Sequence, residues 1–201
     1  MKDARDAAIR TIKDEHRTIS AVLHGLRYLA QQSLDAKVQP DFAVFRAMIY
    51  YIDEFPERLH HPKEEKVLFV RLLAKVPEAS ALVAELHGEH IEGAKLIRSL
   101  EHELLYFEEN WPGGAASFKG AVDAYADFHW NHMRKEEGKV LPLAVERLDA
   151  PDWEVIAAEF GANNDPIAGV PEKEFDTLFS RIASIAPDPI GFGSRWKKAP
   201  A

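Results

Sequence analysis

The stretch His60-His61-Pro62-Lys63-Glu64-Glu65 recurs as His132-Met133-Arg134-Lys135-Glu136-Glu137, so both copies read His-x-x-Lys-Glu-Glu. On an α-helix, residues four apart lie one above the other on the same face. Each copy therefore directs an imidazole nitrogen and a carboxylate oxygen to one point in space. Such a pair of side chains is typical of metal ligands, and this chain carries it twice.

The spacing of apolar residues around these copies predicts four long helices. Pro56 and Pro62 lie inside the second helix, so we expect a kink or a short break close to His60. The helices are expected over roughly 4–33, from Pro40-Asp41 with Asp41 as N-cap to about Lys75, from Val76-Pro77-Glu78 onward, and after the turn Trp111-Pro112-Gly113-Gly114.

The repeat extends beyond the two copies, because Glu15-His16 and Glu89-His90 open matching segments 74 positions apart. Each half is then a helical hairpin with one histidine on its first helix and His-x-x-x-Glu on its second. We predict an all-α fold, an antiparallel up-down four-helix bundle over residues 1–150 with six ligands projecting inward. These ligands are His16, His60, Glu64, His90, His132 and Glu136.

Residues 151–201 are expected to form a short helical C-terminal extension. Two short helices, about 151–161 and 171–184, are predicted, followed by a tail rich in Pro, Gly and Lys. We expect this tail either to wrap the bundle or to be loose.

Composition excludes several classes of protein and of site. The net charge of −8 is spread along the chain, which argues against a nucleic-acid or anionic-membrane partner. No run of 18 apolar residues is present, and the start lacks the apolar core of a signal peptide, so a cytoplasmic location is expected. The absence of cysteine leaves nitrogen and oxygen as the only metal donors.

A purely structural role for the two glutamates is the alternative to a metal site. Burying Glu64 and Glu136 without a cation would cost several kcal/mol each, so that alternative needs a basic partner for both. Lys63 and Lys135 lie on other faces of their helices, and no arginine in the apolar stripes suits either carboxylate. Imidazole and carboxylate without thiolate suit iron, manganese or zinc. Six ligands exceed what one tetrahedral zinc needs, so we expect two ions bridged by the glutamates, iron first and manganese next.

The chain resembles the hemerythrin-like proteins with the HHE cation-binding domain, over roughly residues 8–148. The motifs that carry the resemblance are Glu15-His16, His60-x-x-x-Glu64-Glu65, Glu89-His90 and His132-x-x-x-Glu136-Glu137. It implies the same six ligands and a non-haem di-iron centre with an oxo or hydroxo bridge. Such a centre binds or reacts with dioxygen, nitric oxide or peroxide. Its expected role is sensing or stress protection, and the activity it would support is the reduction of peroxide or oxygen.

Two departures from the oxygen-carrying hemerythrins bear on function. Those proteins have His-x-x-x-His on the third helix where this chain has His87-x-x-His90, and they end with His-x4-Asp where it has His132-x-x-x-Glu136. They hold one iron with three histidines and the other with two. The match is therefore closer to the bacterial sensor, iron-repair and peroxide-handling relatives than to reversible oxygen carriers.

Three further residues are candidates for the surroundings of the metal. His61 points about 100° away from His60 on an ideal helix, but Pro62 could bring it to the metal. His129 lies one turn before His132 and is either a seventh ligand or a hydrogen-bonding neighbour of one. Tyr125 is the tyrosine best placed by periodicity to neighbour the centre, and the same position also suits ordinary core packing.

Other functions remain open at this point. In iron storage or delivery, the protein would bind iron and release it again instead of using it for a reaction. Reversible oxygen carriage would need another ligand in place of the missing third-helix histidine. Ferritin-like oxidases use paired Glu-x-x-His motifs, whereas this chain has only Glu57-x-x-His60. A metal-free interaction module is disfavoured by the two buried carboxylates.

Overall fold

The computed structural model describes residues 2–34, 39–162, 180–187 and 189–192. Within these ranges the protein is all-helical, with no β-strand. The main helices of the bundle are α1 (Lys2–Leu34), α5 (Ser80–Glu109), α6 (Ala115–Lys135) and the segment that begins with α2 (Phe42–Ile52). The helix α2 begins as predicted, because the Asp41 carboxylate accepts a hydrogen bond from the Ala43 amide at 2.9 Å and so caps its first turn.

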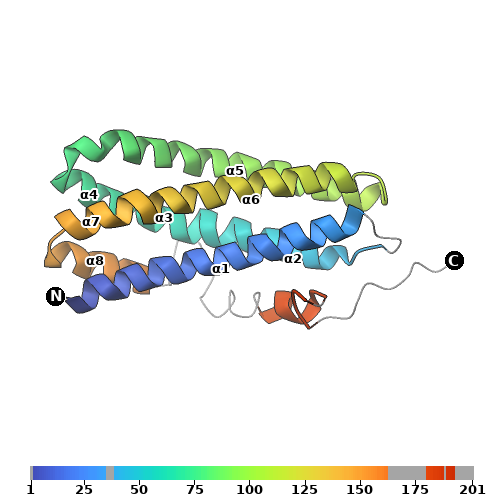
Figure 1. Ribbon diagram of the computed structural model, residues 1–201, viewed down its shortest axis with the longest axis horizontal. Helices are drawn as coiled ribbons and strands as arrows, with labels where there is room; N and C mark the ends of the chain where they lie inside the picture. The colour runs from blue at the N-terminus through green and yellow to red at the C-terminus, as the bar shows by residue number, and fades with distance from the viewer. Residues whose placement is uncertain (1, 35–38, 163–179, 188, 193–201) are drawn as a thin grey trace.

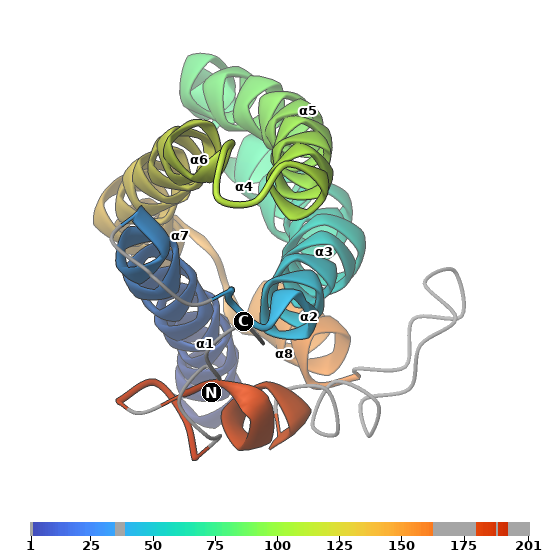
Figure 2. The ribbon, with the colours of Figure 1, turned by 90° about the vertical axis from the view of Figure 1, so that its right-hand side faces the viewer.

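The long helices enclose a common interior. In Figure 1, α1, α5 and α6 extend side by side along the long axis, and Figure 2 shows the segment from α2 to α4 (Phe69–Lys75) on the remaining side. The contacts agree, since α1 packs on α6, α6 on α5, and α5 on α2. The turn at Trp111-Pro112-Gly113-Gly114 joins α5 to α6 as expected, and Gly114 takes the left-handed φ of 82° that glycine adopts without a Cβ clash.

The second helical segment contains no break at His60, but it is wound more widely there. A π-helix, η1 (Asp53–His60), contains Pro56 and leads into α3 (His61–Lys63) and a second π-helix, η2 (Glu64–Leu68). The repeat is visible here too, because η4 (Glu136–Val140) follows α6 at the equivalent position and leads into α7 (Leu141–Arg147). Among the π-helices of the described residues, η1 alone lacks a counterpart in the second half. Short π-helical stretches within α-helices are frequent at functional sites.

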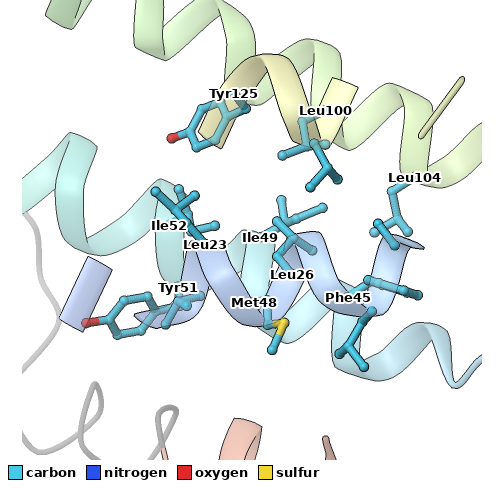
Figure 3. Packing of buried hydrophobic residues seen from close by; sticks show 14 of the residues in the cluster. Leu23, Leu26, Phe45, Met48, Ile49, Tyr51, Ile52, Leu100, Leu104 and Tyr125 are labelled. Carbon is cyan, nitrogen blue, oxygen red and sulfur yellow. The ribbon is translucent and has the colours of Figure 1, made fainter. Parts of the chain in front are cut away.

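Two apolar clusters fill the interior on either side of the histidines. Figure 3 shows part of the larger one, which contains Leu23, Leu26, Phe45, Met48, Ile49, Leu100 and Leu104. The smaller cluster includes Ile12, Phe69, Leu72 and Leu86. The band of His and Glu side chains lies between the two, so it is closed off along the helix axes by packed hydrocarbon.

The described residues of the C-terminal extension pack against the bundle, whereas 163–179 and most of the predicted tail, 193–201, lie outside the described residues. The helix α8 (Ala150–Gly161) begins with a capping box between Asp149 and Asp152 and contacts both α1 and η2. Its Trp153, Ile156 and Phe160 belong to the smaller core cluster. Residues 180–185 are helical, and Ile182 joins the larger cluster, while 171–179 of the predicted second helix lie outside the described residues. No helix in the described ranges is long and apolar enough to cross a membrane.

Candidate metal centre

The predicted ligands come together in two adjoining clusters, each able to hold one ion. The first consists of His16, His60, Glu64 and Glu136, and the second of His61, Glu64, His90 and His132. Within each cluster the donor atoms lie within 4.8 Å of one another, and every residue is buried. All six residues of the repeat are therefore in one place, and Glu64 belongs to both clusters.

The two glutamates lie between the histidines of the two clusters. Glu64 directs Oε1 toward His60 Nε2 at 3.3 Å and Oε2 toward His90 Nε2 at 3.5 Å. Glu136 directs Oε2 toward His16 Nε2 at 3.4 Å and Oε1 toward His132 Nε2 at 3.2 Å. Each carboxylate thus presents one oxygen to each cluster.

The donor set fits metal ions by two further observations. All four carboxylate oxygens of Glu64 and Glu136 are buried without a hydrogen-bond partner, a costly arrangement unless a cation lies between them. The Nε2 atoms of His16 and His60 are 3.0 Å apart, and those of His90 and His132 are 3.1 Å apart. Two imidazole nitrogens bound at about 2.1 Å to one ion at a right angle would lie about 3 Å apart. The histidine pairs are therefore spaced as ligands of a common ion.

Four glutamates outside the two clusters hold the histidines, and their positions repeat between the two halves of the chain. We call them the outer glutamates: Glu15, Glu65, Glu89 and Glu137. His60 Nδ1 donates to Glu15 Oε2 at 2.6 Å, and His132 Nδ1 donates to Glu89 Oε2 at 3.0 Å. Across the interior, His16 Nδ1 donates to Glu137 at 2.9 Å and His90 Nδ1 donates to Glu65 at 2.6 Å. With Nδ1 protonated, Nε2 of each imidazole is left as the metal donor.

The lysines of the two motifs hold two of the outer glutamates. Lys63 is buried, and its Nζ lies 3.4 Å from Glu15, while Lys135 forms an ion pair with Glu89. Every charged residue of His-x-x-Lys-Glu-Glu thus has a position in the centre. The roles of Glu15, Glu89, Lys63 and Lys135 were not predicted from the sequence, although these residues recur at matching positions of the repeat.

The charges of the metal-free site stabilise one another. Burial lowers the pKa of His60, but the neighbouring Glu64 and Glu15 carboxylates outweigh it and raise this pKa well above its ordinary value. Burial likewise opposes protonation of His90, yet Glu136 and Glu64 raise its pKa to about 10. Protons on the histidines therefore balance the buried carboxylates in the absence of metal.

His61 and His129 differ in position. His61 lies in the second cluster, with its ring stacked on that of His90 at 4.2 Å between centroids. His60 ends the π-helix η1 and His61 begins α3, and these consecutive residues face different clusters. His129 is in neither cluster, and its Nε2 faces Glu57 at 3.6 Å. Burial and the nearby His132 and His90 lower the pKa of His129 to about 3, so it is neutral.

A model of the hemerythrin HHE cation-binding domain matches residues 7–144. This chain belongs to that family. A comparison with curated proteins found no match. Membership of a cation-binding family agrees with the two buried clusters, all of whose residues lie inside the matched range.

Two surface pockets reach the centre. One of about 630 Å³ lies between α1 and α6 and ends at His16 and Glu137. The other, of about 410 Å³, lies between η1 and α5 and ends at Glu57, His61 and His90. The second cluster can therefore be approached from the η1 side.

Proposed function

We propose that this protein holds two iron ions inside an antiparallel up-down four-helix bundle and binds or reduces a small ligand there. The ligand would be dioxygen, nitric oxide or peroxide, and the role would be sensing or stress protection. One observation carries the proposal: Glu64 and Glu136 are buried without hydrogen-bond partners, and each directs one oxygen to each of two histidine clusters.

The proposed ligand set assigns His16 and His60 to the first ion and His61, His90 and His132 to the second. Glu64 and Glu136 would each offer one oxygen to either ion. Imidazole and carboxylate donors favour iron or manganese over magnesium or calcium, and zinc is less suited because the second ion would receive five donors, one more than a tetrahedral shell holds. When bound, a pair of iron ions would supply an open position for a ligand and electrons for its reduction.

The chain's own residues orient and shield the centre. The outer glutamates fix each imidazole with Nε2 inward, which prepares the site before metal enters. The apolar clusters on both sides exclude water, so a ligand would arrive through the pockets beside His16 or His61. A shielded centre with limited entry suits a small ligand better than a bulky substrate.

The first test is metal analysis with an absorption spectrum of protein purified in air. We expect two irons per chain and the near-ultraviolet absorption of oxo-bridged ferric iron. Protein that takes up fewer than one iron per chain after anaerobic loading, or that prefers zinc under the same conditions, would contradict the proposal. Iron that exchanges rapidly with a weak chelator would instead favour storage or delivery.

Reversible oxygen carriage is the second candidate, and the position of His61 favours it. With His61 in the second cluster, the histidines divide three to two, as they do in the oxygen-carrying proteins that the chain resembles. The two candidates separate when reduced protein is given dioxygen and then evacuated. An absorption band that disappears and returns over several cycles supports carriage, whereas irreversible oxidation supports reduction or sensing.

A further inference from the structure

The two surface pockets that reach the centre are equivalent to each other in the repeat. Residues of α1 correspond to residues of α5 74 positions later, and the segment from η1 to η2 corresponds to α6 and η4 72 positions later. Of the nine residues that line the pocket between α1 and α6, eight have their counterpart in the lining of the pocket between η1 and α5. We call these two pockets the α1 pocket and the α5 pocket. Because they share one architecture, a difference in what they admit comes from their side chains.

The α5 pocket is the more acidic of the two. The α1 pocket is lined by one carboxylate, that of Glu137, and two guanidinium groups, those of Arg17 and Arg134. The α5 pocket is lined by three carboxylates and two guanidinium groups, from Asp53, Glu57, Glu65, Arg58 and Arg98. Carboxylates thus outnumber guanidinium groups in the α5 pocket, and the reverse holds in the α1 pocket. A lining of this sign attracts cations to the α5 pocket.

The two arginines of the α5 pocket lie at its exposed end and are paired with acids. Arg58 forms ion pairs with Asp53 at 3.3 Å and with Glu54 at 3.1 Å. Arg98 forms ion pairs with Asp53 at 3.3 Å and with Glu101 at 2.8 Å. Half or more of each arginine side chain is exposed. The guanidinium charges are therefore compensated where they lie, and the inner part of the pocket remains acidic.

Donor side chains lead along the α5 pocket from the surface to the second cluster. His87 Nδ1 lies 3.0 Å from Glu65 Oε1, and the same oxygen lies 2.6 Å from His90 Nδ1. The exposed fraction of the side chains falls along this series, from 59% at His87 through 28% at Glu65 to 8% at His90. Imidazole and carboxylate are donors that suit iron. A cation that binds at His87 is thus one carboxylate away from a residue of the second cluster.

The position equivalent to His87 carries a lysine in the other half of the repeat. Lys13 stands 74 positions before His87. Contact with His16 lowers the pKa of Glu137, and the positive charge of Lys13 adds to this effect. The ammonium group is therefore near Glu137, where it repels a second cation. The α1 pocket thus has a charge that opposes iron at the place where the α5 pocket has a donor for it.

The buried end of the α5 pocket holds a nitrogen without a hydrogen-bond partner. His61 is buried and lines the pocket, and its Nδ1 is unpartnered, with Glu57 Oε2 3.3 Å away. Burial raises the pKa of Glu57 to about 7, so this carboxylate is mostly charged at pH 7.5. Met133 takes the place of His61 in the α1 pocket, and its thioether is a soft donor of the kind that selects copper(I). The α5 pocket therefore has an imidazole and a carboxylate where the α1 pocket has a thioether.

We propose that the α5 pocket is the entry route for iron(II) and that His87 and Glu65 bind the ion on its way to the second cluster. This inference rests on the proposed di-iron function and adds the path by which the metal arrives. The acidic lining draws the hydrated cation, and the imidazole and carboxylate replace part of its water shell before it reaches the buried ligands. His87 is in neither cluster, so the histidine that distinguishes this chain from the oxygen carriers acts on the approach to the centre.

The test is the rate at which metal-free protein takes up iron(II) without oxygen at pH 7.5. Unbound iron is trapped at set times with a chromophoric chelator. Ile91 is half exposed and corresponds to Arg17, so Ile91→Arg gives the α5 pocket the cationic approach of the α1 pocket. This change should slow uptake about tenfold, and added salt should reduce the difference. His87→Ala should slow uptake about fivefold at low and high salt alike, because it removes a donor and not a full charge.

Release of iron separates an entry route from a structural role. Neither substitution should change the iron content at equilibrium or the affinity, because His87 and Ile91 are in neither cluster. With the affinity unchanged, release of iron to excess chelator must slow by the same factor as uptake. A purely structural role, in which His87 holds Glu65 in place, would instead lower the affinity and speed release, and that result would overturn the proposal.

The repeat supplies matched controls. Lys13→Ala and Arg17→Ile are the corresponding changes at the α1 pocket and should leave the uptake rate unchanged. Ile91→Gln alters the same side chain without adding a charge and should also leave it unchanged. Uptake at the unaltered rate in both Ile91→Arg and His87→Ala, or equal slowing in Lys13→Ala and His87→Ala, overturns the entry route alone. Unaltered protein that takes up no pair of iron ions overturns it together with the proposed function.

Discussion

Glu15 Oε2 lies 2.6 Å from His60 Nδ1 in the buried interior, and Lys63, three residues after His60, holds the other oxygen of the same carboxylate. Glu89, His132 and Lys135 repeat this arrangement in the second half. The contact fixes the tautomer and the orientation of a histidine that we assign to the metal. It also gives a role to Glu15 and Glu89, the glutamates that directly precede His16 and His90 in the sequence.

The outer glutamates should therefore set metal affinity without setting stoichiometry. We expect Glu15→Gln and Glu89→Gln each to weaken iron binding about 10- to 100-fold, because the amide holds the imidazole less firmly and lowers its basicity. Competition with a chromophoric chelator measures the change. Glu92→Gln, at an exposed position of α5, is the control and should bind as the unaltered protein does. Equal affinities in all three variants would count against a positioning role.

Replacing Glu64 should change the metal content of the protein, whereas replacing its neighbour Glu65 should change only the metal affinity. Glu64 faces both clusters, so Glu64→Ala should lose at least one of the two ions, and Glu136→Ala should behave alike. Glu65 contacts His90 from outside, so Glu65→Ala should keep both ions at lower affinity. Metal analysis after gel filtration distinguishes the two outcomes. Full occupancy in both Glu64→Ala and Glu136→Ala would refute the bridging assignment.

The metal-free protein should lose stability as the pH rises. The pKa of His90 is about 10 in the folded state and 6.5 in the unfolded state, so its contribution is fully present below about pH 6.5 and is lost as the pH approaches 10. Urea unfolding of metal-free protein at pH 6.5 and pH 9 measures this effect. Metal replaces the protons, so loading with iron at pH 7 should release protons and flatten the dependence. A metal-free protein that is more stable at pH 9 than at pH 6.5 would be inconsistent with protonated histidines in the site.

The helix α8 should contribute to the centre as well as to the fold. Phe160 is fully buried, its ring meets that of His60 edge-on at 6.1 Å, and Lys63 Nζ lies 5.5 Å from its centre. Phe160→Ala should cost about 3–5 kcal/mol of stability by leaving a cavity. It should also speed the removal of iron by a chelator, because the wall beside His60 is opened. Val155→Ala, at a largely exposed position of the same helix, should change stability by less than about 0.5 kcal/mol and leave the chelation rate unaltered.

The sequence by itself determined the helical class, the repeat and the residues that gather at the centre. Helical spacing places His60 over Glu64 and His132 over Glu136 whatever their neighbours do, so local geometry alone predicts these pairs. The sequence also located the turn within each hairpin: the first lies before the Asp41 cap of α2, and the second lies before α6. These features depend on contacts within one or two helical turns, which can be predicted directly from the sequence.

Only the tertiary structure decided which side chains of the four helical segments come together at the centre. His61 joins the second cluster from the junction of η1 and α3, a position that the geometry of an ideal helix does not predict. The contact of Glu137 with His16 joins residues 121 positions apart, and no local rule pairs them. Gly93, Glu57 and His129 come from three separate helical segments and meet in the interior, which the sequence does not show. Helix spacing is a property of the backbone, whereas these pairings depend on which faces meet across the interior, and that is fixed by packing of the whole chain.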